Sequence, residues 1–281
     1  MAKKTQFLLV VVLSGLMTAC VSVGEIADSL SAAIMNQTDP DIVSDGLPAY
    51  LLLLDAMIEQ EPNDEELLIA AARLNSAYAG GFVVKPERMR QISSKALAYA
   101  RRAICLEYED LCTMLQQPLD QYSGELHQID DDSDVPFLYA FVTAWAGYIQ
   151  AHSDNWQAIA DLPKVQATIE WVLELDERFD QGGAHLYLGV LLTLRPATLG
   201  GQPERGRQHF LRAIELSAGR NLMAKVMYAR YYARLVFDQK LHDQLLNEVL
   251  AADVEASKLS LLNTLAKQQA KELLAGSNDY F

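Results

Sequence analysis

Apolar residues recur at steps of three and four along almost the whole chain, and this spacing constrains the fold more than any other feature. It is the period of a helix that buries one face. The stripe between residues 47 and 60 consists of Leu51, Leu52, Leu54, Met57 and Ile58. No stretch alternates apolar and polar residues over enough positions to argue for a strand. The sequence therefore predicts an all-α fold.

Short turn signals divide this pattern into helices. Asn63 and Glu66 have the spacing of a capping box, and Gly80-Gly81 is typical of a helix end. The predicted helices span residues 47–60, 64–79, 86–117, 136–150, 163–176, 184–194, 204–217, 222–237, 241–251 and 258–274, with a boundary near Glu107 left open. The predicted helices that begin at residues 184 and 222 are separated by a distance in sequence close to the repeat length of tetratricopeptide hairpins. We expect one domain over 40–281, in which tetratricopeptide-like hairpins stack into a compact solenoid or bundle.

The predicted helix 136–150 carries no charged residue and is apolar nearly all round. Such a helix lies in the middle of a bundle or crosses a membrane, and its apolar part is short for a membrane span. We therefore expect it to form the centre of the core. Its aromatic residues Tyr139, Trp145 and Tyr148 are candidates for lining a ligand cavity, with plain core packing as the alternative.

The N-terminus has the pattern of an export signal. Lys3 and Lys4 precede the apolar run 7–13, and small residues lead to Cys20. A cysteine at this place resembles the lipobox of bacterial lipoproteins, in which the thiol takes a diacylglyceryl group. We expect residues 1–19 to be a lipoprotein signal peptide, Cys20 to be the lipid attachment site and 20–39 to be a tether; plain secretion is the alternative. Val21 in place of Asp favours the inner leaflet of the outer membrane.

The chain is acidic, with a formal net charge of −14. Nucleic-acid binding at physiological salt rests on clustered Lys and Arg, so nucleic acid is a poor candidate partner. An acidic body is also not attracted to an anionic leaflet. We expect membrane attachment through the acyl chains on Cys20 alone.

Cys105 and Cys112 fall in one predicted helix, 86–117. Seven residues of continuous helix separate two Cα atoms by about 10 Å, which is too far for a disulfide. The sequence thus predicts two small buried side chains, or pairing with another helix or another molecule.

Motifs that carry chemistry are weak here. The run 130–134 is rich in Asp, but an EF-hand loop starting there would need Gly and Glu where the chain has Val135 and Phe141, so we expect a solvated loop that caps the next helix. The glycines of 201–208 lack the Lys and Ser or Thr of a phosphate-binding loop. None of the histidines has metal-ligand spacing, although His185 and His209 could meet across a hairpin. We expect no catalytic residues, no metal, no cofactor and no enzyme activity.

Several runs in chain order resemble the TatT component family of TRAP transporters, the tripartite ATP-independent periplasmic transporters. The resemblance covers about 40 to 281. The runs are Gly46-Leu47-Pro48-Ala49, Glu61-Pro62-Asn63-Asp64, Ala77-Tyr78-Ala79-Gly80-Gly81, Asp134-Val135-Pro136, Gly200-Gly201-Gln202-Pro203-Glu204, Ile214-Glu215-Leu216-Ser217-Ala218-Gly219, Val226-Met227-Tyr228-Ala229-Arg230-Tyr231-Tyr232 and Asp279-Tyr280-Phe281.

The resemblance implies a periplasmic lipoprotein that associates with the solute-binding P subunit, as members do. It also implies a homo-oligomer, because members assemble as trimers, and a helical cavity that carries a hydrophobic or carboxylate ligand. The alternatives are an envelope scaffold lipoprotein for protein assembly and a periplasmic lipid or fatty-acid carrier that acts alone.

Overall fold

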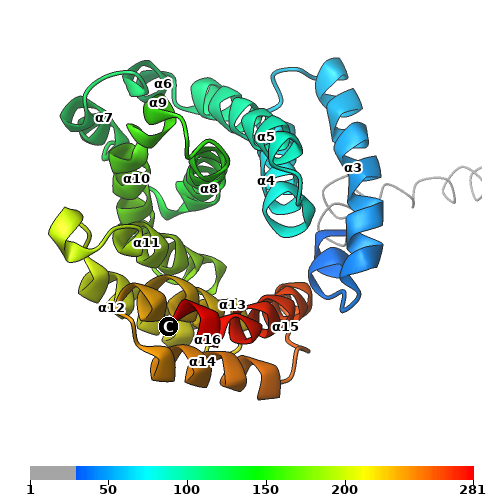
Figure 1. Ribbon diagram of the computed structural model, residues 1–281. Coiled ribbons are helices and arrows are strands. Elements are labelled where there is room, and N and C mark those ends of the chain that lie inside the picture. Colours follow the sequence, from blue (N-terminus) through cyan, green and yellow to red (C-terminus); the bar gives the residue numbers. More distant parts are fainter. Residues whose placement is uncertain (1–29) are drawn as a thin grey trace, which may run out of the picture.

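The computed structural model describes residues 30–281, and over these residues the chain is helical with no strand. Successive helices pack as neighbours around a closed ring (Figure 1). The prediction of an all-α fold is confirmed. The predicted signal peptide, Cys20 and the first part of the tether lie outside the described residues. None of the described helices is long and apolar enough to cross a membrane.

Two helices form the N-terminal part of the ring after a short helix at 30–35. They are α3 (Pro40–Gln60) and α4 (Glu65–Phe82). The prediction placed the start of the first of these at residue 47, seven residues late, because Asp39 caps the helix through the N–H of Asp41 and Pro40 opens it.

The ends of α4 also differ from the prediction. The cap is Asp64, whose carboxylate accepts the N–H of Leu67 at 2.9 Å, rather than Asn63. The helix continues through Gly80 and Gly81 to Phe82 instead of ending before them. A Cβ at Gly81 would lie 3.7 Å from Leu265, an ordinary contact, so this glycine lies inside the helix without being needed for a turn.

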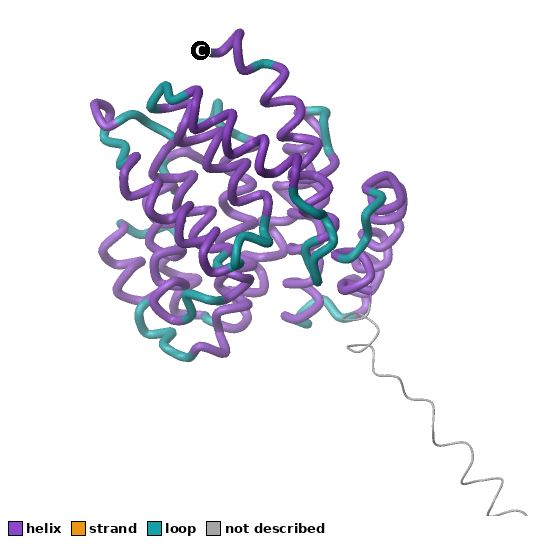
Figure 2. The backbone as a smooth tube through the Cα atoms, turned by 90° about the horizontal axis from the view of Figure 1, so that it is seen from below, coloured by secondary structure: helices purple, strands orange, loops and turns teal. Residues whose placement is uncertain are grey.

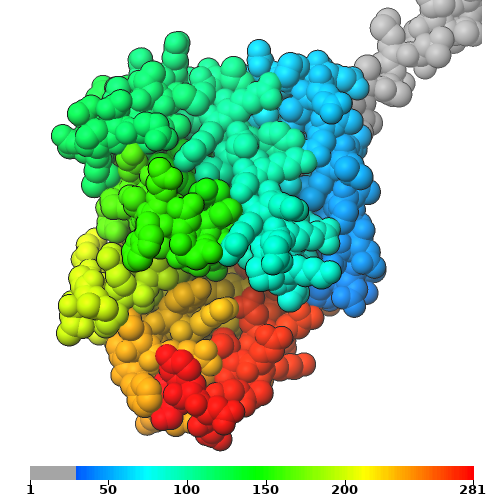
Figure 3. Space-filling view, turned by 45° about the horizontal axis from the view of Figure 1, so that its top comes forward, coloured from blue at the N-terminus to red at the C-terminus, as the bar shows by residue number. Residues whose placement is uncertain are grey.

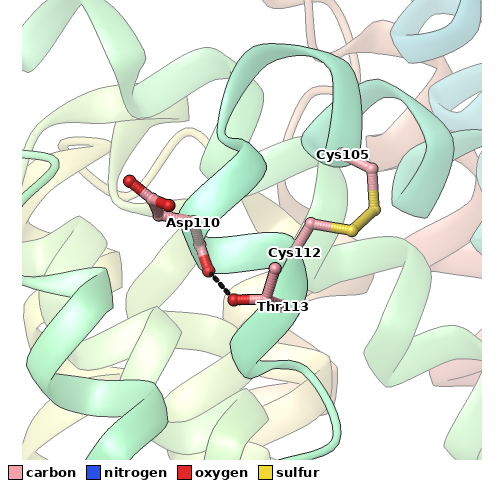
Figure 4. Close-up of a disulfide and its surroundings, with 4 residues drawn as sticks. All are labelled: Cys105, Asp110, Cys112 and Thr113. Atoms are coloured by element: carbon pink, nitrogen blue, oxygen red, sulfur yellow. Dashed lines mark hydrogen bonds between the residues drawn. A yellow bond between two sulfur atoms is a disulfide. The ribbon is translucent and has the colours of Figure 1, made fainter.

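The predicted long helix 86–117 is two helices, α5 (Pro86–Glu107) and α6 (Glu109–Met114), which meet at Tyr108. Tyr108 leaves the helical conformation, and the chain turns. The turn brings the Cα atoms of Cys105 and Cys112 to 4.8 Å, and the two sulfurs are bonded (Figure 4). Our exclusion of a disulfide between these residues was therefore wrong, since it assumed an unbroken helix.

The middle of the chain continues with α7 (Leu119–Leu126), the short η1 (Asp132–Asp134), α8 (Val135–Ala151), α9 (Trp156–Ile159) and α10 (Leu162–Leu175). The uncharged helix α8 packs against α4, α5 and α10. Trp145 and Phe141 are fully buried in the largest core cluster of the described residues. The expectation of a central core helix is confirmed.

The second half begins with η2 (Phe179–Gln181), α11 (Gly183–Thr193), η3 (Ala197–Leu199) and α12 (Pro203–Leu216). It ends with α13 (Leu222–Met227), the π-helix η4 (Tyr228–Ala233), α14 (Gln239–Ala251), α15 (Ser260–Ala275) and α16 (Ser277–Tyr280). This half has its own core cluster, which includes Phe210 and Leu246.

The last long helix closes the ring against the first. Leu261 of α15 packs on the cluster that contains Val43 and Leu47 of α3, and the side-chain oxygen of Asn36 accepts the N–H of Lys258 at 2.7 Å. The space-filling view shows the red C-terminal segment against the blue N-terminal one (Figure 3). The tube view shows the C-terminus far from the point where the described chain begins (Figure 2).

Candidate functional site

The most distinctive polar group of the described residues joins α8 to the turn that precedes α11. The hydroxyl of Tyr139 donates to Oδ2 of Asp180 at 3.0 Å. The Tyr139 ring lies edge-on to Phe179, with centroids 5.2 Å apart, and edge-on to Tyr187, at 6.1 Å. We call the group of Arg73, Tyr139, Phe179, Asp180 and Tyr187 the Asp180 site.

The backbone at Asp180 is held in a conformation that side chains disfavour. Asp180, Gln181 and Gly182 have φ values of 50°, 56° and 82°, so three consecutive residues are left-handed. A non-glycine residue in this region costs free energy and persists only where its surroundings hold it. Here the strained turn directs the Asp180 carboxylate at the Tyr139 hydroxyl.

Gly183 fits this contact closely. A Cβ atom at Gly183 would lie 2.3 Å from the Tyr139 hydroxyl and 2.7 Å from Oδ2 of Asp180. These separations are far below van der Waals contact, so the absence of a side chain at 183 lets the two polar groups meet beside the start of α11.

Surrounding protein shifts both ionisable groups. Loss of water around the carboxyl raises the pKa of Asp180, while the Tyr139 hydroxyl and the positive charge of Arg73 act in the opposite direction. Burial, then the nearby Asp180 charge, raises the pKa of Tyr139 well above its usual range. Burial and Asp180 together raise the pKa of Tyr187 to about 12. Both tyrosines therefore stay protonated and can donate.

The exposure of Asp180 shows how the site is placed. Asp180 keeps an exposed surface, and yet the protein around it removes enough water to raise its pKa. Asp180 is thus partly shielded from solvent by its neighbours and partly exposed to it. Figure 1 places the helices that carry the site, α4, α8 and α11, around the middle of the ring.

The other two aromatic candidates of α8 lie elsewhere. Trp145 has no exposed surface, and its indole N–H donates to Asp161 at 3.2 Å. This is core packing, the alternative that the sequence left open. Tyr148 is half-buried and stacks on His152 at 4.2 Å, away from the Tyr139 contacts. Of the three candidates, Tyr139 alone belongs to the Asp180 site.

A second polar cluster joins α11 to α12. The Nδ1 atoms of His185 and His209 are 2.7 Å apart, so the meeting across a hairpin that the sequence left possible does occur. Nε2 of His185 lies 3.2 Å from Glu177, which also accepts two hydrogen bonds from Arg212. Burial lowers the pKa of His185, and burial with the neighbouring His185 and Arg205 charges lowers the pKa of His209 to about 4. Both shifts favour the neutral rings, of which one donates to the other in this bond.

The remaining sequence motifs have structural roles. Asp131 accepts the N–H of Ser133 at 2.8 Å and caps η1, and Asp134 accepts the hydroxyl of Tyr108 at the same distance. The glycines at 200 and 201 lie in the turn before α12, as expected. Within residues 30–281, no three His, Cys, Asp or Glu side chains gather in a group that could hold a metal ion.

The family comparison matches almost all of the described chain. The model of the family described as "TRAP transporter T-component" matches residues 36–281. The chain belongs to this family. A search of curated proteins gives no match. As a T-component, the chain is an accessory part of a TRAP transporter and belongs to the cell envelope.

Sequence reasoning missed most of the Asp180 site. It placed 182–183 in a connection between helices but gave no role to Asp180, Arg73 or Tyr187. The signal that was present is the run Asp-Gln-Gly-Gly, in which two glycines follow an aspartate and can take a turn with positive φ. Nothing in the periodicity pairs this turn with Tyr139, which lies 41 positions before Asp180, or with Arg73, which lies 107 positions before it.

Proposed function

We propose that the protein is the lipid-anchored periplasmic component of a TRAP transporter and that it docks the solute-binding P subunit. The observation that carries the proposal is the family match over 36–281. The helical ring binds its partner as a folded module without covalent chemistry. The T-component family is a family of transporter accessory subunits, which also favours a binding role over catalysis.

The disulfide supports the periplasmic part of the proposal independently of the N-terminal signal. Cys105 and Cys112 are half-buried and bonded across the α5–α6 turn. Disulfides persist in oxidising compartments such as the periplasm and are rare in the reducing cytosol. An exported protein with an acylated Cys20 fits this chemistry, and the outer membrane is the proposed site of the anchor.

The Asp180 site supports a second part of the proposal, in which the ring receives a small ligand and passes it to or from the P subunit. The ligand classes implied by the family resemblance are hydrophobic molecules and carboxylates. Aromatic side chains and Arg73 are suited to these two classes. A homo-oligomer, a trimer in particular, is the proposed assembly.

Co-purification tests the docking. The tagged protein should retain its cognate P subunit when both are present at micromolar concentration, and an unrelated periplasmic binding protein should be washed away. Loss of the cognate subunit under the same conditions would contradict the proposal. Recovery of a protein-folding factor instead would favour the scaffold, and apolar ligand in native mass spectra without any partner would favour the carrier.

A separate experiment tests the anchor. Labelled palmitate should be incorporated into the protein, and Cys20→Ser should release it from membranes into the soluble periplasmic fraction. Cys105→Ser with Cys112→Ser is the matched control, because it also replaces cysteine by serine but leaves the lipid attachment site. Unchanged membrane retention of Cys20→Ser would refute acylation at this residue.

A further inference from the structure

A cleft that shares no residue with the Asp180 site lies where α5 meets the turn between α8 and α9. It opens to solvent and has a volume of about 630 Å³. Ligand sites of proteins have volumes of about 300–1,000 Å³, so this space is large enough for a small molecule. We call it the Trp156 cleft. The residues that line it are Arg90, His152, Asp154, Asn155, Trp156 and Gln157.

Trp156 is the most unusual residue of this cleft. It is 83% exposed, although tryptophan is a side chain that proteins mostly bury. Trp145 and Trp171 donate their indole N–H groups at 3.2 Å and 2.8 Å, whereas Trp156 donates to no group within the described part of the chain. Packing inside the molecule therefore does not account for a tryptophan at this position.

The turn that carries Trp156 is held in place from α5. The guanidinium of Arg90 donates through Nε to the carbonyl of Ala151 at 3.1 Å and through Nη2 to Oδ2 of Asp154 at 3.0 Å. The side-chain oxygen of Asn155 accepts the backbone N–H two positions later at 2.9 Å. A wall fixed by a long-range contact and a local one presents the indole without a costly rearrangement on binding.

The charged groups of the cleft are paired with each other. Arg90 is the one guanidinium of the lining and Asp154 the one carboxylate, and they form an ion pair at 3.0 Å. With histidine counted as neutral, the lining carries no net charge. A charged ligand would have to compete with this pair, whereas a neutral ligand leaves it intact.

Several polar atoms of the lining are free to bind a ligand. The second carboxylate oxygen of Asp154, the amide NH₂ groups of Asn155 and Gln157 and the indole N–H of Trp156 form no hydrogen bond among residues 30–281. These groups include both donors and acceptors. They lie beside a flat aromatic face that is open to solvent.

This combination matches the surface of a pyranose ring. One face of such a ring carries C–H groups, which pack on the negative face of an indole. Its edge carries hydroxyl groups, which donate and accept and so suit amides and a carboxylate oxygen. The ring as a whole is neutral, as the lining of the cleft is.

We propose that the Trp156 cleft binds a neutral sugar, with a pyranose ring stacked on Trp156 and its hydroxyls on Asp154 and Asn155. The inference goes beyond the proposed function, in which this cleft has no part. Because the cleft is open, it admits an internal segment of a glycan as well as a free sugar. Hydrogen bonds that compete with water contribute little net free energy each, so we expect dissociation constants in the millimolar range.

Acrylamide quenching of tryptophan fluorescence tests the stacking on the purified full chain, in a detergent without a sugar head group. Trp145 has no exposed surface and Trp171 is half-buried, so acrylamide reaches mainly Trp156. Saturating cellobiose or maltose should protect this emission, and calorimetric titration should give the same dissociation constant. Glucose, glucosamine and glucuronate offer a neutral, a cationic and an anionic form of one ring, and glucose should bind at least as tightly as the charged forms.

Variants place the sugar in the cleft. Trp156→Ala should weaken cellobiose or maltose binding about tenfold in calorimetry, and Trp156→Phe should weaken it less, because a smaller ring remains. Phe237→Ala is the matched control, since Phe237 is also an exposed aromatic residue, at 64%, but does not line the cleft. It should bind as the parent does. Thermal unfolding verifies that each variant folds.

Co-sedimentation with insoluble cellulose and chitin distinguishes the two sources of the sugar. Retention of the parent but not of Trp156→Ala would support the inference and assign the cleft to a glycan chain. Binding of cellobiose or maltose without such retention would also support it and assign the cleft to a free sugar.

Three results would overturn the inference. They are no saturable binding of any of these sugars, equal binding by the parent and Trp156→Ala, and tighter binding of glucosamine or glucuronate than of glucose. Loss of the P subunit from Trp156→Ala, with no sugar bound by the parent, would assign the surface to docking instead. Co-purification of the parent with the P subunit is measured separately, so a failure of the sugar site is distinguishable from a failure of the docking.

Discussion

Helix α8 makes two similar contacts whose surroundings differ. On one side, the indole of Trp145 donates to Asp161, and Arg101 completes the group: its guanidinium lies 3.7 Å from Asp161 and 5.5 Å from the Trp145 ring. On the other side, the hydroxyl of Tyr139 donates to Asp180, but the cation in range, Arg73, makes no such contact. In the first group the acid contacts both an aromatic donor and a cation, whereas in the second no ion pair to the acid is found among the described residues.

This difference separates a structural group from a candidate binding site. The Trp145 group brings its aromatic donor, its acid and its cation into contact with each other, so it has a structural role. The Asp180 site holds a carboxylate on a strained backbone turn, and among the described residues no ion pair to this carboxylate compensates for the strain. Backbone strain of this kind clusters at functional sites such as ligand-binding positions.

The largest expected effect concerns the Trp145 group. Trp145→Ala should lower the free energy of unfolding by about 3–5 kcal/mol, because a fully buried indole leaves a cavity in the central cluster. Urea unfolding followed by circular dichroism measures the loss. Trp145→Phe is the control and should cost less. A loss below about 1 kcal/mol for the alanine variant would show that Trp145 does not carry the core.

The second prediction concerns the disulfide and whether the packing at the start of α8 depends on it. Tyr108, within the loop that Cys105 and Cys112 close, donates to Asp134 at the start of α8. Replacing both cysteines by serine should lower the free energy of unfolding by about 2 kcal/mol, as expected for a short loop. Urea titrations of the oxidised parent and the variant give the difference. An unchanged midpoint would mean that the turn at Tyr108 forms equally well without the bond.

A double-mutant cycle that pairs Gly183 with Tyr139 tests the packing of the Asp180 site. Gly183→Ala should destabilise the protein by about 1–3 kcal/mol, since the new methyl group would overlap the Tyr139 hydroxyl and the Asp180 carboxylate. Tyr139→Phe removes that hydroxyl. If the overlap is the cause, the double variant should recover part of the loss. Strictly additive free energies would place the strain of Gly183→Ala elsewhere.

The smallest effect is a dependence of stability on pH that arises from the pair of His185 and His209, near the Asp180 site. His185 and His209 have lowered pKa values in the folded protein, about 4 for His209, so below about pH 6.5 the unfolded chain binds protons that the folded chain does not. Stability should therefore fall as the pH drops from about 6.5 to about 4, by on the order of 1 kcal/mol after allowance for partial exposure. The charged groups around the pair are Glu177, Arg205 and Arg212.

Thermal unfolding over this pH range measures the effect. His209→Gln should flatten the dependence, while His127→Gln, which removes a histidine outside the pair, should keep the parent slope. An equal slope in both variants would contradict the role of the pair.

The sequence predicted what depends on neighbours along the chain. The helical period predicted the fold class and the buried α8, and hairpin geometry left a meeting of His185 and His209 possible. It failed where one residue changes direction: Tyr108 breaks a helix whose pattern looked continuous, and the disulfide follows from that break. It also failed to pair Tyr139 with Asp180, because α8 and the turn before α11 must pack before residues that far apart in the chain meet.

The closure of the ring has a consequence for how the chain reaches its folded state. The contact between Asn36 and Lys258 spans 222 positions, and the apolar face of α3 around Val43 and Leu47 is completed by a residue of α15. Contacts this remote are slow to form, since a long loop must close before they contribute. A nascent chain that lacks α15 cannot cover this part of the apolar face of α3. That surface therefore stays exposed, and prone to aggregation, until synthesis is almost finished.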